Sequence, residues 1–254
     1  MTDRYAQIGF SQRVRLEWMA HAARLVDAGN TPAEVEQGLQ EALSDKLSVG
    51  GTAERGNREK AITILLRVWV RPPAVIEPLR DEGLRLLQDL PKPHQMLVHW
   101  GMAMAVYPFW GAVAETTGRM LRLQGTAAAA QVQRRVKEAY GERDTVARAA
   151  RRVLRSFHDW GVLEETGTKG VYEPHAPASV SDPMAIAWLM EAVLRARPDT
   201  RAPPRVIAES PALFPFQLQW SGGPAIGGNP RLDVARHGLD EEIVMLKTTT
   251  SRQA

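Results

Sequence analysis

The sequence predicts a mainly α-helical protein: a helical N-terminal module, a winged helix-turn-helix and a small mixed C-terminal part. Two observations favour this class. Apolar residues recur at helical spacing as far as Trp160, and after Gly161 the pattern changes to short extended runs. Proline interrupts the chain at Pro91-Lys92-Pro93 and becomes frequent from Pro174 onward. We therefore expect a helical module over 1–92, a winged helix-turn-helix over 93–175, and a Pro/Gly-rich part with one helix and short strands over 176–254.

Composition places the chain among ordinary globular proteins. Its 254 residues are 44% hydrophobic and 24% charged, enough to build a core without covalent staples. The absence of cysteine excludes disulfides, cysteine nucleophiles, thiolate zinc sites and iron–sulfur clusters, and it fits a reducing, cytoplasmic setting. No signal peptide is visible at the start. Residues 93–114 carry no charge, but His94, His99 and Pro108 favour a buried helix broken at the proline over a membrane span.

The N-terminal module is expected to hold a series of short helices. The first spans Ser11–Ala28 and ends at Gly29-Asn30. The second begins with Thr31-Pro32-Ala33-Glu34, which has the residue order of a capping box with proline in the first turn. A loop over Val49–Gly56 follows, then an apolar helix through Ile62 and Trp69 that must end before Pro72-Pro73, then a helix over Ala74–Leu90.

In the middle region, helices over Gln95–Val106 and Phe109–Leu123 meet at Tyr107-Pro108. A helix over Thr126–Tyr140 stops at Gly141, and Asp144 or Thr145 is the expected N-cap of the next helix, which runs to Trp160. Val162–Thr166 and Val171–Glu173 are expected strands, joined by the hairpin turn Gly167–Gly170.

The C-terminal part has one clear helix, Pro183–Arg195, with Asp182 as its N-cap. Val206–Ile207 and Leu213–Trp220 are expected to be extended, and Ser221–Pro230 is expected to be a glycine-rich loop. The tail Leu232–Leu246 fits either two short strands or one helix.

The expected helix that ends at Trp160 has two contrasting faces. At ~100° per residue its apolar side chains share one side, and four arginines fall within a sector of about 100° on the other. The arginines are Arg148, Arg151, Arg152 and Arg155. The acids of this helix are only Asp144 at its start and Asp159 at its end, so the arginine face has no matching carboxylates on its own helix.

Charge is concentrated around this helix. The net charge of the chain is only +3, yet the window from Arg119 to Asp159 holds ten basic and four acidic residues. In a winged helix-turn-helix the second helix enters the major groove and the hairpin tip approaches phosphates. The expected partner is therefore duplex DNA. Its contacts are the four arginines, Lys169 at the wing tip, and either Gln131 and Gln133 or Arg134 and Arg135 on the preceding helix, facing backbone phosphates.

Two other interpretations of the arginine face stay open. It could be a solvated surface, or could pair with Glu164, Glu165 or the tail acids Asp240, Glu241 and Glu242. Winged-helix units also serve as protein-interaction modules. In that case the chain would be a scaffold whose arginine face binds an acidic protein.

Sites for chemistry are not evident. His94 and His99 are five residues apart rather than the three or four that share a helix face, so they do not form a metal pair. The glycine-rich segments lack the Gly-Lys-Ser/Thr ending of a phosphate-binding loop, and no GxSxG occurs. We expect no enzyme activity, no metal or other cofactor, no small-molecule substrate and no membrane partner.

The segment Tyr107-Pro108-Phe109-Trp110 follows an apolar helix and precedes a basic helical pair, which ends in Phe157-His158-Asp159-Trp160-Gly161-Val162-Leu163. With these features the sequence resembles the BrxA family of bacterial BREX phage-defence systems over about residues 10–175. The resemblance implies a DNA-binding accessory component of a multi-protein defence complex, without catalysis of its own. The chain departs from the family in its length, its arginine and alanine content and its C-terminal part. A winged-helix transcriptional regulator is the alternative.

Overall fold

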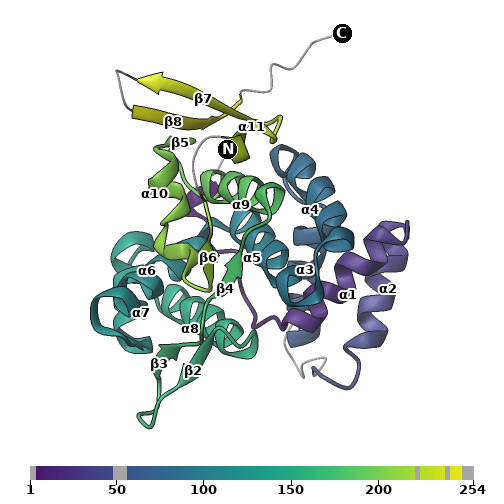
Figure 1. Ribbon diagram of the computed structural model, residues 1–254. Helices are drawn as coiled ribbons and strands as arrows, with labels where there is room; N and C mark the ends of the chain where they lie inside the picture. Colours follow the sequence, from purple (N-terminus) through teal and green to yellow (C-terminus); the bar gives the residue numbers. More distant parts are fainter. Residues whose placement is uncertain (1–3, 48–55, 221–223, 238–240, 248–254) are drawn as a thin grey trace.

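The computed structural model describes residues 4–47, 56–220, 224–237 and 241–247. The protein is mainly helical, as the sequence predicts (Figure 1). Its α-helices are α1 (Leu16–Asp27), α2 (Pro32–Ala42), α3 (Asn57–Trp69), α4 (Glu77–Asp89), α5 (Gln95–Val106), α6 (Pro108–Gln124), α7 (Ala129–Tyr140), α8 (Asp144–Asp159), α9 (Pro183–Arg195), α10 (Pro204–Ala208) and α11 (Pro224–Gly227). Short 3₁₀ turns are η1 (Arg4–Ala6), η2 (Ala74–Ile76), η3 (Lys92–His94) and η4 (Pro211–Leu213).

Within the described residues the strands form three small sheets. They are β1 (Ala127–Ala128), β2 (Leu163–Glu165), β3 (Val171–Pro174), β4 (Ala178–Val180), β5 (Arg201–Ala202), β6 (Phe216–Leu218), β7 (Leu232–His237) and β8 (Glu241–Leu246). The first sheet has the order β1-β3-β2 and is antiparallel, β4 and β6 pair in parallel, and β8 lies between β5 and β7.

The N-terminal helices follow the expected signals closely. At α2 the Glu34 backbone N–H donates to the Thr31 hydroxyl (3.4 Å), and the Thr31 N–H donates to the Glu34 carboxylate (2.7 Å), which completes the capping box. The first helix begins at Leu16 rather than at Ser11, and its N-cap Arg15 has an extended backbone. The expected loop over Val49–Gly56 lies outside the described residues except for Gly56.

Helix α5 lies at the centre of the molecule, between α3 and α4 on one side and α6 and α9 on the other (Figure 1). Every residue from Leu97 to Val106 is buried, so this helix has no solvent face. The uncharged stretch therefore forms a core helix broken at Pro108. Among the described residues no single helix is long and apolar enough to span a membrane, and the only pair that reaches that composition together, 92–106 with 108–124, bends by 116°.

Glycines allow the closest helix contacts around α5. A Cβ at Gly101 would lie 2.4 Å from the ring of Trp188 on α9, and one at Gly83 on α4 would lie 3.0 Å from the same ring. The Trp188 indole N–H donates to the carbonyl of Leu79 (2.9 Å), which holds the ring in place. These contacts join α4, α5 and α9, and one hydrophobic core therefore runs through all three expected regions of the chain.

A buried carboxylate attaches the C-terminal part to this core. Glu191 on α9 is fully buried and receives hydrogen bonds from Arg195 (2.7 Å), Arg231 (2.9 Å) and Asn229 (2.8 Å). Burial of a charge is costly unless it is paired and hydrogen-bonded, and these three donors meet that need. The segment that leads into β7 is thereby held against α9, and the tail is a β7–β8 hairpin rather than a helix.

The element order from residue 108 to residue 174 is α6, β1, α7, α8, β2, β3. Two details differ from the sequence-based expectation. Ala127 and Ala128 were expected in a helix but form β1, because their backbone pairs with Tyr172 and Val171 of β3. The expected caps Asp144 and Thr145 lie inside α8. Its N-cap is Arg143, whose side chain donates to the carbonyl of Tyr140 instead of capping the helix.

The C-terminal part shows further differences. Val206 and Ile207, expected to be extended, lie in α10, since Pro203-Pro204 starts a helical turn there. In the segment Leu213–Trp220 only Phe216–Leu218 is a strand, and it pairs with β4. The expected glycine-rich loop contains the short helix α11, and the helix α9 is capped by Asp182 as predicted, with the Ala185 N–H at 2.8 Å.

The approach of α6 to η4 provides a stability test. A Cβ at Gly118 would lie 2.0 Å from the carbonyl oxygen of Pro211, and both are backbone positions that cannot rotate away. We expect Gly118→Ala to lower the free energy of unfolding by about 2 kcal/mol, the range typical of overpacking. Urea unfolding followed by circular dichroism measures it. Gly167→Ala, where no described atom lies within 4 Å of the added Cβ, is the control. Equal stability of the two variants would contradict the proposed close contact.

Candidate nucleic-acid interface

Helix α8 presents the two faces that the helical spacing predicts. Its apolar side chains, including Val146, Val153 and Phe157, are buried in the core. On the other side Arg148, Arg151 and Arg155 are exposed and Arg152 is partly exposed. Phe157 packs between Trp100 and Trp110, with ring centroids at 4.8 and 4.9 Å, so the orientation of the helix about its axis is determined by the core.

The four arginines have no anionic partners within the described part of the chain, where their guanidinium groups form neither ion pairs nor hydrogen bonds. Burial lowers the pKa of the Arg152 guanidinium, and the neighbouring charges of Arg148 and Arg151 lower it further. These like charges repel one another, so an anion bound at this face would be stabilised by electrostatic attraction to all four. The α8 face is thus a concentrated, unneutralised positive surface.

Among the described acids that the sequence offers as partners of this face, Glu164, Glu165 and Glu242 form no ion pair with the four arginines. Glu165 accepts the backbone N–H of Gly170 (2.5 Å), and Glu164 lies opposite Glu173 across the β2–β3 pair. Glu242 lies 3.8 Å from Arg236. Asp240 lies outside the described residues, and the Glu241 side chain is likewise not described.

Lys169 lies in the turn between β2 and β3, which extends from the body of the molecule beside α8 (Figure 1). The turn is closed by hydrogen bonds from the Thr166 N–H to the Val171 carbonyl (2.9 Å) and from the Val171 N–H to the Thr168 carbonyl (3.0 Å). Lys169 is exposed and forms no ion pair with a residue that the structure describes. Its ammonium group is accessible to an anion from solvent.

Arg134 and Arg135 lie in a different place. They line a groove of about 730 Å³ between α6 and α7, together with Arg119, Gln131 and Leu123. Arg135 pairs with Glu138 on the same helix (3.1 Å). The structure therefore brings these two arginines together with Arg119, and not into the cleft that Arg151, Arg152 and Arg155 line.

The N-terminal segment before α1 packs along α8, which sequence reasoning did not foresee. The Val14 N–H donates to the Ser156 hydroxyl (3.0 Å), and the Trp160 indole N–H donates to the Val14 carbonyl (3.0 Å). Arg13 forms an ion pair with Asp159 at 2.7 Å. The partners are more than 140 positions apart, and no local pattern in the sequence links them.

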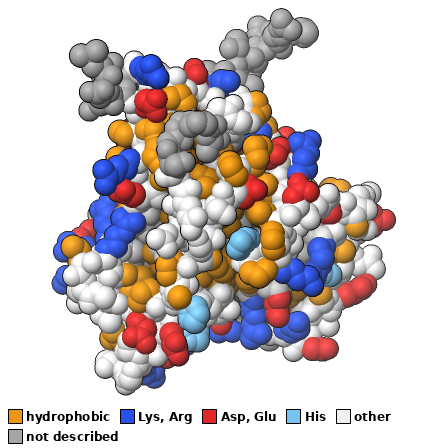
Figure 2. All heavy atoms as spheres, viewed as in Figure 1, with side chains coloured by type: hydrophobic (Ala, Val, Ile, Leu, Met, Phe, Trp, Pro, Cys, Tyr) orange, Lys and Arg blue, Asp and Glu red, His pale blue; other side chains and the backbone are white. Residues whose placement is uncertain are grey.

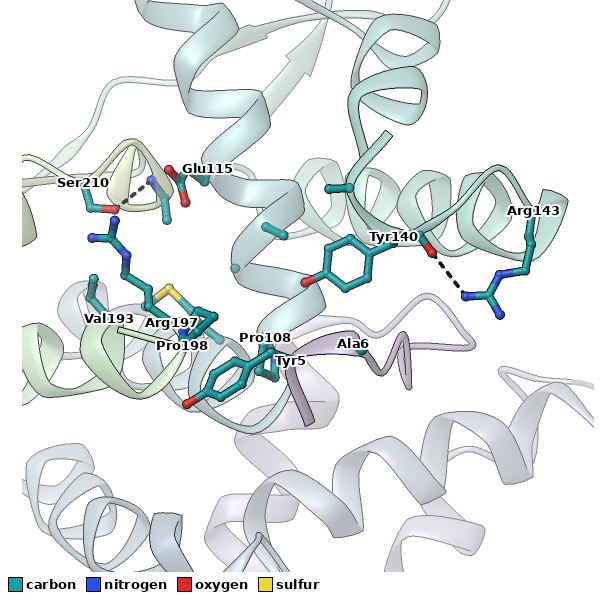
Figure 3. A pocket seen from close by; sticks show the side chains of 16 residues that line it. Tyr5, Ala6, Pro108, Glu115, Tyr140, Arg143, Val193, Arg197, Pro198 and Ser210 are labelled. Atoms are coloured by element: carbon teal, nitrogen blue, oxygen red, sulfur yellow. Dashed lines mark hydrogen bonds between the residues drawn. The ribbon is translucent and has the colours of Figure 1, made fainter. Parts of the chain in front are cut away.

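A second cavity of about 490 Å³ lies among η1, α6, the end of α7 and the end of α9. Figure 3 shows that its labelled polar side chains come from separate elements, with Glu115, Arg197 and Ser210 toward one side and Tyr140 and Arg143 toward the other. Glu115 pairs with Arg119, the Ser210 hydroxyl accepts the Ala212 N–H (3.3 Å), and Arg143 extends along the outer end of the cavity.

The two histidines of the uncharged stretch lie in consecutive elements. His94 lies in η3, and His99 is buried in α5 with its ring edge-on to Trp69 (centroids 5.3 Å apart). Within the described ranges no group of three or more His, Asp or Glu side chains is placed to hold a metal ion.

Comparisons with protein-family models, with curated proteins and with solved structures found no match to this chain. The resemblance to the BrxA family therefore stays a prediction.

His99 makes stability depend on pH. Burial, with a smaller contribution from the charge of Arg24, lowers the pKa of His99 from 6.5 to about 3. Between these values the unfolded chain binds a proton at this position and the folded chain does not, so stability falls as the pH falls below 6.5. The expected contribution is about 1.4 kcal/mol per pH unit. Urea unfolding at pH 7, 5.5 and 4.5 measures it, and the slope should be smaller in His99→Phe. The same slope in both proteins would show that His99 is protonated in the fold.

Proposed function

We propose that residues 108–174 form a winged helix-turn-helix and that the protein binds duplex DNA through α8. The order α6-β1-α7-α8-β2-β3 and the strand order β1-β3-β2 support this, since they give a helix pair followed by a β-hairpin that shares a sheet with an earlier strand. Strand β1 adds support that the sequence did not offer, because its pairing with β3 attaches the hairpin to the start of α7.

The observation that carries the proposal is the unpartnered arginine face of α8. A guanidinium group binds a phosphate or the edge of guanine with two parallel hydrogen bonds, and duplex DNA supplies both kinds of acceptor. In the proposed docking, α8 lies in the major groove, where arginines that reach base edges add sequence preference. Lys169 in the β2–β3 turn contacts a backbone phosphate and adds affinity only.

We propose that Arg134 and Arg135 contact phosphates beside the interface formed by α8 and Lys169. Because Arg135 already pairs with Glu138, Arg134 is the stronger candidate of the two. Their groove faces a different part of the surface from the α8 cleft, so they would meet a phosphate only where the duplex extends past α7.

The resemblance to the BrxA family extends the proposal to an accessory role in a phage-defence complex, in which DNA binding serves partner proteins. A footprint restricted to one palindromic operator would favour a transcriptional regulator instead. If the arginine face binds no DNA but binds an acidic protein, the scaffold alternative takes its place.

Charge reversal on the face tests DNA binding directly. We expect Arg151→Glu/Arg155→Glu to weaken binding of a fluorescent duplex by about tenfold or more at low salt, because two cationic contacts are replaced by repulsive ones. The slope of log affinity against log salt concentration should decrease by about 2, since each phosphate contact contributes about 0.9. Fluorescence anisotropy at several salt concentrations measures both quantities.

The matched control is Arg205→Glu/Arg236→Glu, which changes the net charge equally at two exposed arginines of the C-terminal part. It should bind duplex like the unmodified protein. If the unmodified protein shows no binding to duplex DNA at low salt, or if both double variants lose affinity equally, the proposed interface is wrong.

A further inference from the structure

A cleft of about 520 Å³ separates the arginine face of α8 from the N-terminal segment. Its basic lining residues come from three distant parts of the chain, and no acidic residue among those that the structure describes lines it. The lining residues are Gln12, Arg13, Arg15, Trp18, Lys46, Leu47, Arg151, Arg152 and Arg155. Figure 2 shows Lys and Arg side chains along the lower edge of the molecule, in the region between α8 and α1 of Figure 1.

The N-terminal wall is formed by the segment just before α1. Arg13 and Arg15 line the cleft, while Val14 between them is fully buried. Both backbone polar groups of Val14 are bonded to side chains at the C-terminal end of α8, to Ser156 in the helix and to Trp160 just after it. The segment is therefore held in a defined position, and both arginines line the cleft.

Positive charge in the cleft exceeds the carboxylates that contact it. Asp159 pairs with Arg13 at 2.7 Å. Arg15 and Lys46 share the single carboxylate of Glu17, at 3.7 and 3.5 Å, and about half of each side chain stays exposed. On the opposite wall Arg151, Arg152 and Arg155 have no acidic partner within the described chain. An anion that enters the cleft meets charge from both walls.

The lining also indicates the chemistry of the anion. Trp18 is only 4% exposed and is covered by Arg15, whose guanidinium carbon lies 5.7 Å from the ring centroid, so the cleft presents no aromatic surface on which a base could stack. The remaining groups are guanidinium and ammonium donors, which suit phosphate oxygens. A duplex cannot enter a space of this volume, but phosphates of one strand can.

We propose that this cleft binds phosphate groups of the DNA backbone, so that Arg15 and Lys46 form the second wall of the interface. The inference depends on the proposed DNA binding and adds to it. Arg148 does not line the cleft and is the arginine of α8 left to face base edges, while Arg151, Arg152 and Arg155 hold the strand that passes between the two walls. The N-terminal module then sets affinity without reading sequence, because phosphate contacts are the same at every base pair.

The test compares the unmodified protein with Arg15→Gln/Lys46→Gln in duplex titrations at several salt concentrations. Both side chains are about half exposed, and thermal melting checks that the variant is folded. We expect several-fold weaker binding, a decrease of about 2 in the salt slope, and an unchanged ratio of affinities for two different duplex sequences. Arg205→Gln/Arg236→Gln is the control with the same change in charge.

The outcomes separate this inference from the proposed function. If Arg15→Gln/Lys46→Gln binds like the unmodified protein while Arg151→Glu/Arg155→Glu loses affinity, the phosphate cleft is wrong and DNA binding stands. A changed ratio between the two sequences would assign the cleft to base recognition and overturn the inference.

If the unmodified protein binds no duplex, DNA binding is wrong, and inorganic pyrophosphate becomes the deciding probe. A rise in melting temperature with pyrophosphate that is lost in Arg15→Gln/Lys46→Gln would support the cleft as a site for a free phosphorylated ligand. No rise in either protein would overturn both proposals.

Discussion

Helix α5 has no polar face, and the rest of the molecule is arranged to cover it. An apolar helix of this kind must be surrounded on all sides, and α3, α4, α6 and α9 do so from positions on both sides of α5 in the chain. Gly101 lets Trp188 of α9 lie directly against the α5 backbone. The C-terminal part is thereby joined to the same core as the N-terminal module, and the Glu191 cluster adds hydrogen bonds to that attachment.

The same core determines what α8 shows to solvent. Trp100 of α5 contacts Trp110 of α6 and Phe157 of α8, and the Trp160 ring lies 5.0 Å from Trp110. Because this aromatic cluster holds the apolar side of α8, the arginines can only point outward. Trp160 also bonds the Val14 carbonyl, so the cluster that orients α8 positions the opposite wall of the basic cleft as well. The packing of α8 and the geometry of the basic cleft thus both depend on this aromatic cluster.

Elements with strong local signals were predictable. The capping box at Thr31, the Asp182 cap of α9 and the β2–β3 hairpin follow from short patterns in which neighbouring residues form the hydrogen bonds that begin a helix or close a turn. Strand β1 was missed because an alanine run favours helix by propensity, while its pairing partner lies more than 40 residues later. The cap of α8 was missed for a related reason: Asp144 has the right residue type, but the chain enters the helix one residue earlier.

The sequence by itself determined that α8 has an arginine face, since helical periodicity places Arg148, Arg151, Arg152 and Arg155 together whatever surrounds them. It also determined that the acids on the same helix are too few to neutralise that face. Only the tertiary structure decided that Arg15 and Lys46 stand across from these arginines and that Arg134 and Arg135 do not. Periodicity is a property of neighbouring residues, whereas the cleft exists because a buried core brings residues 13–15 against residues 156–160.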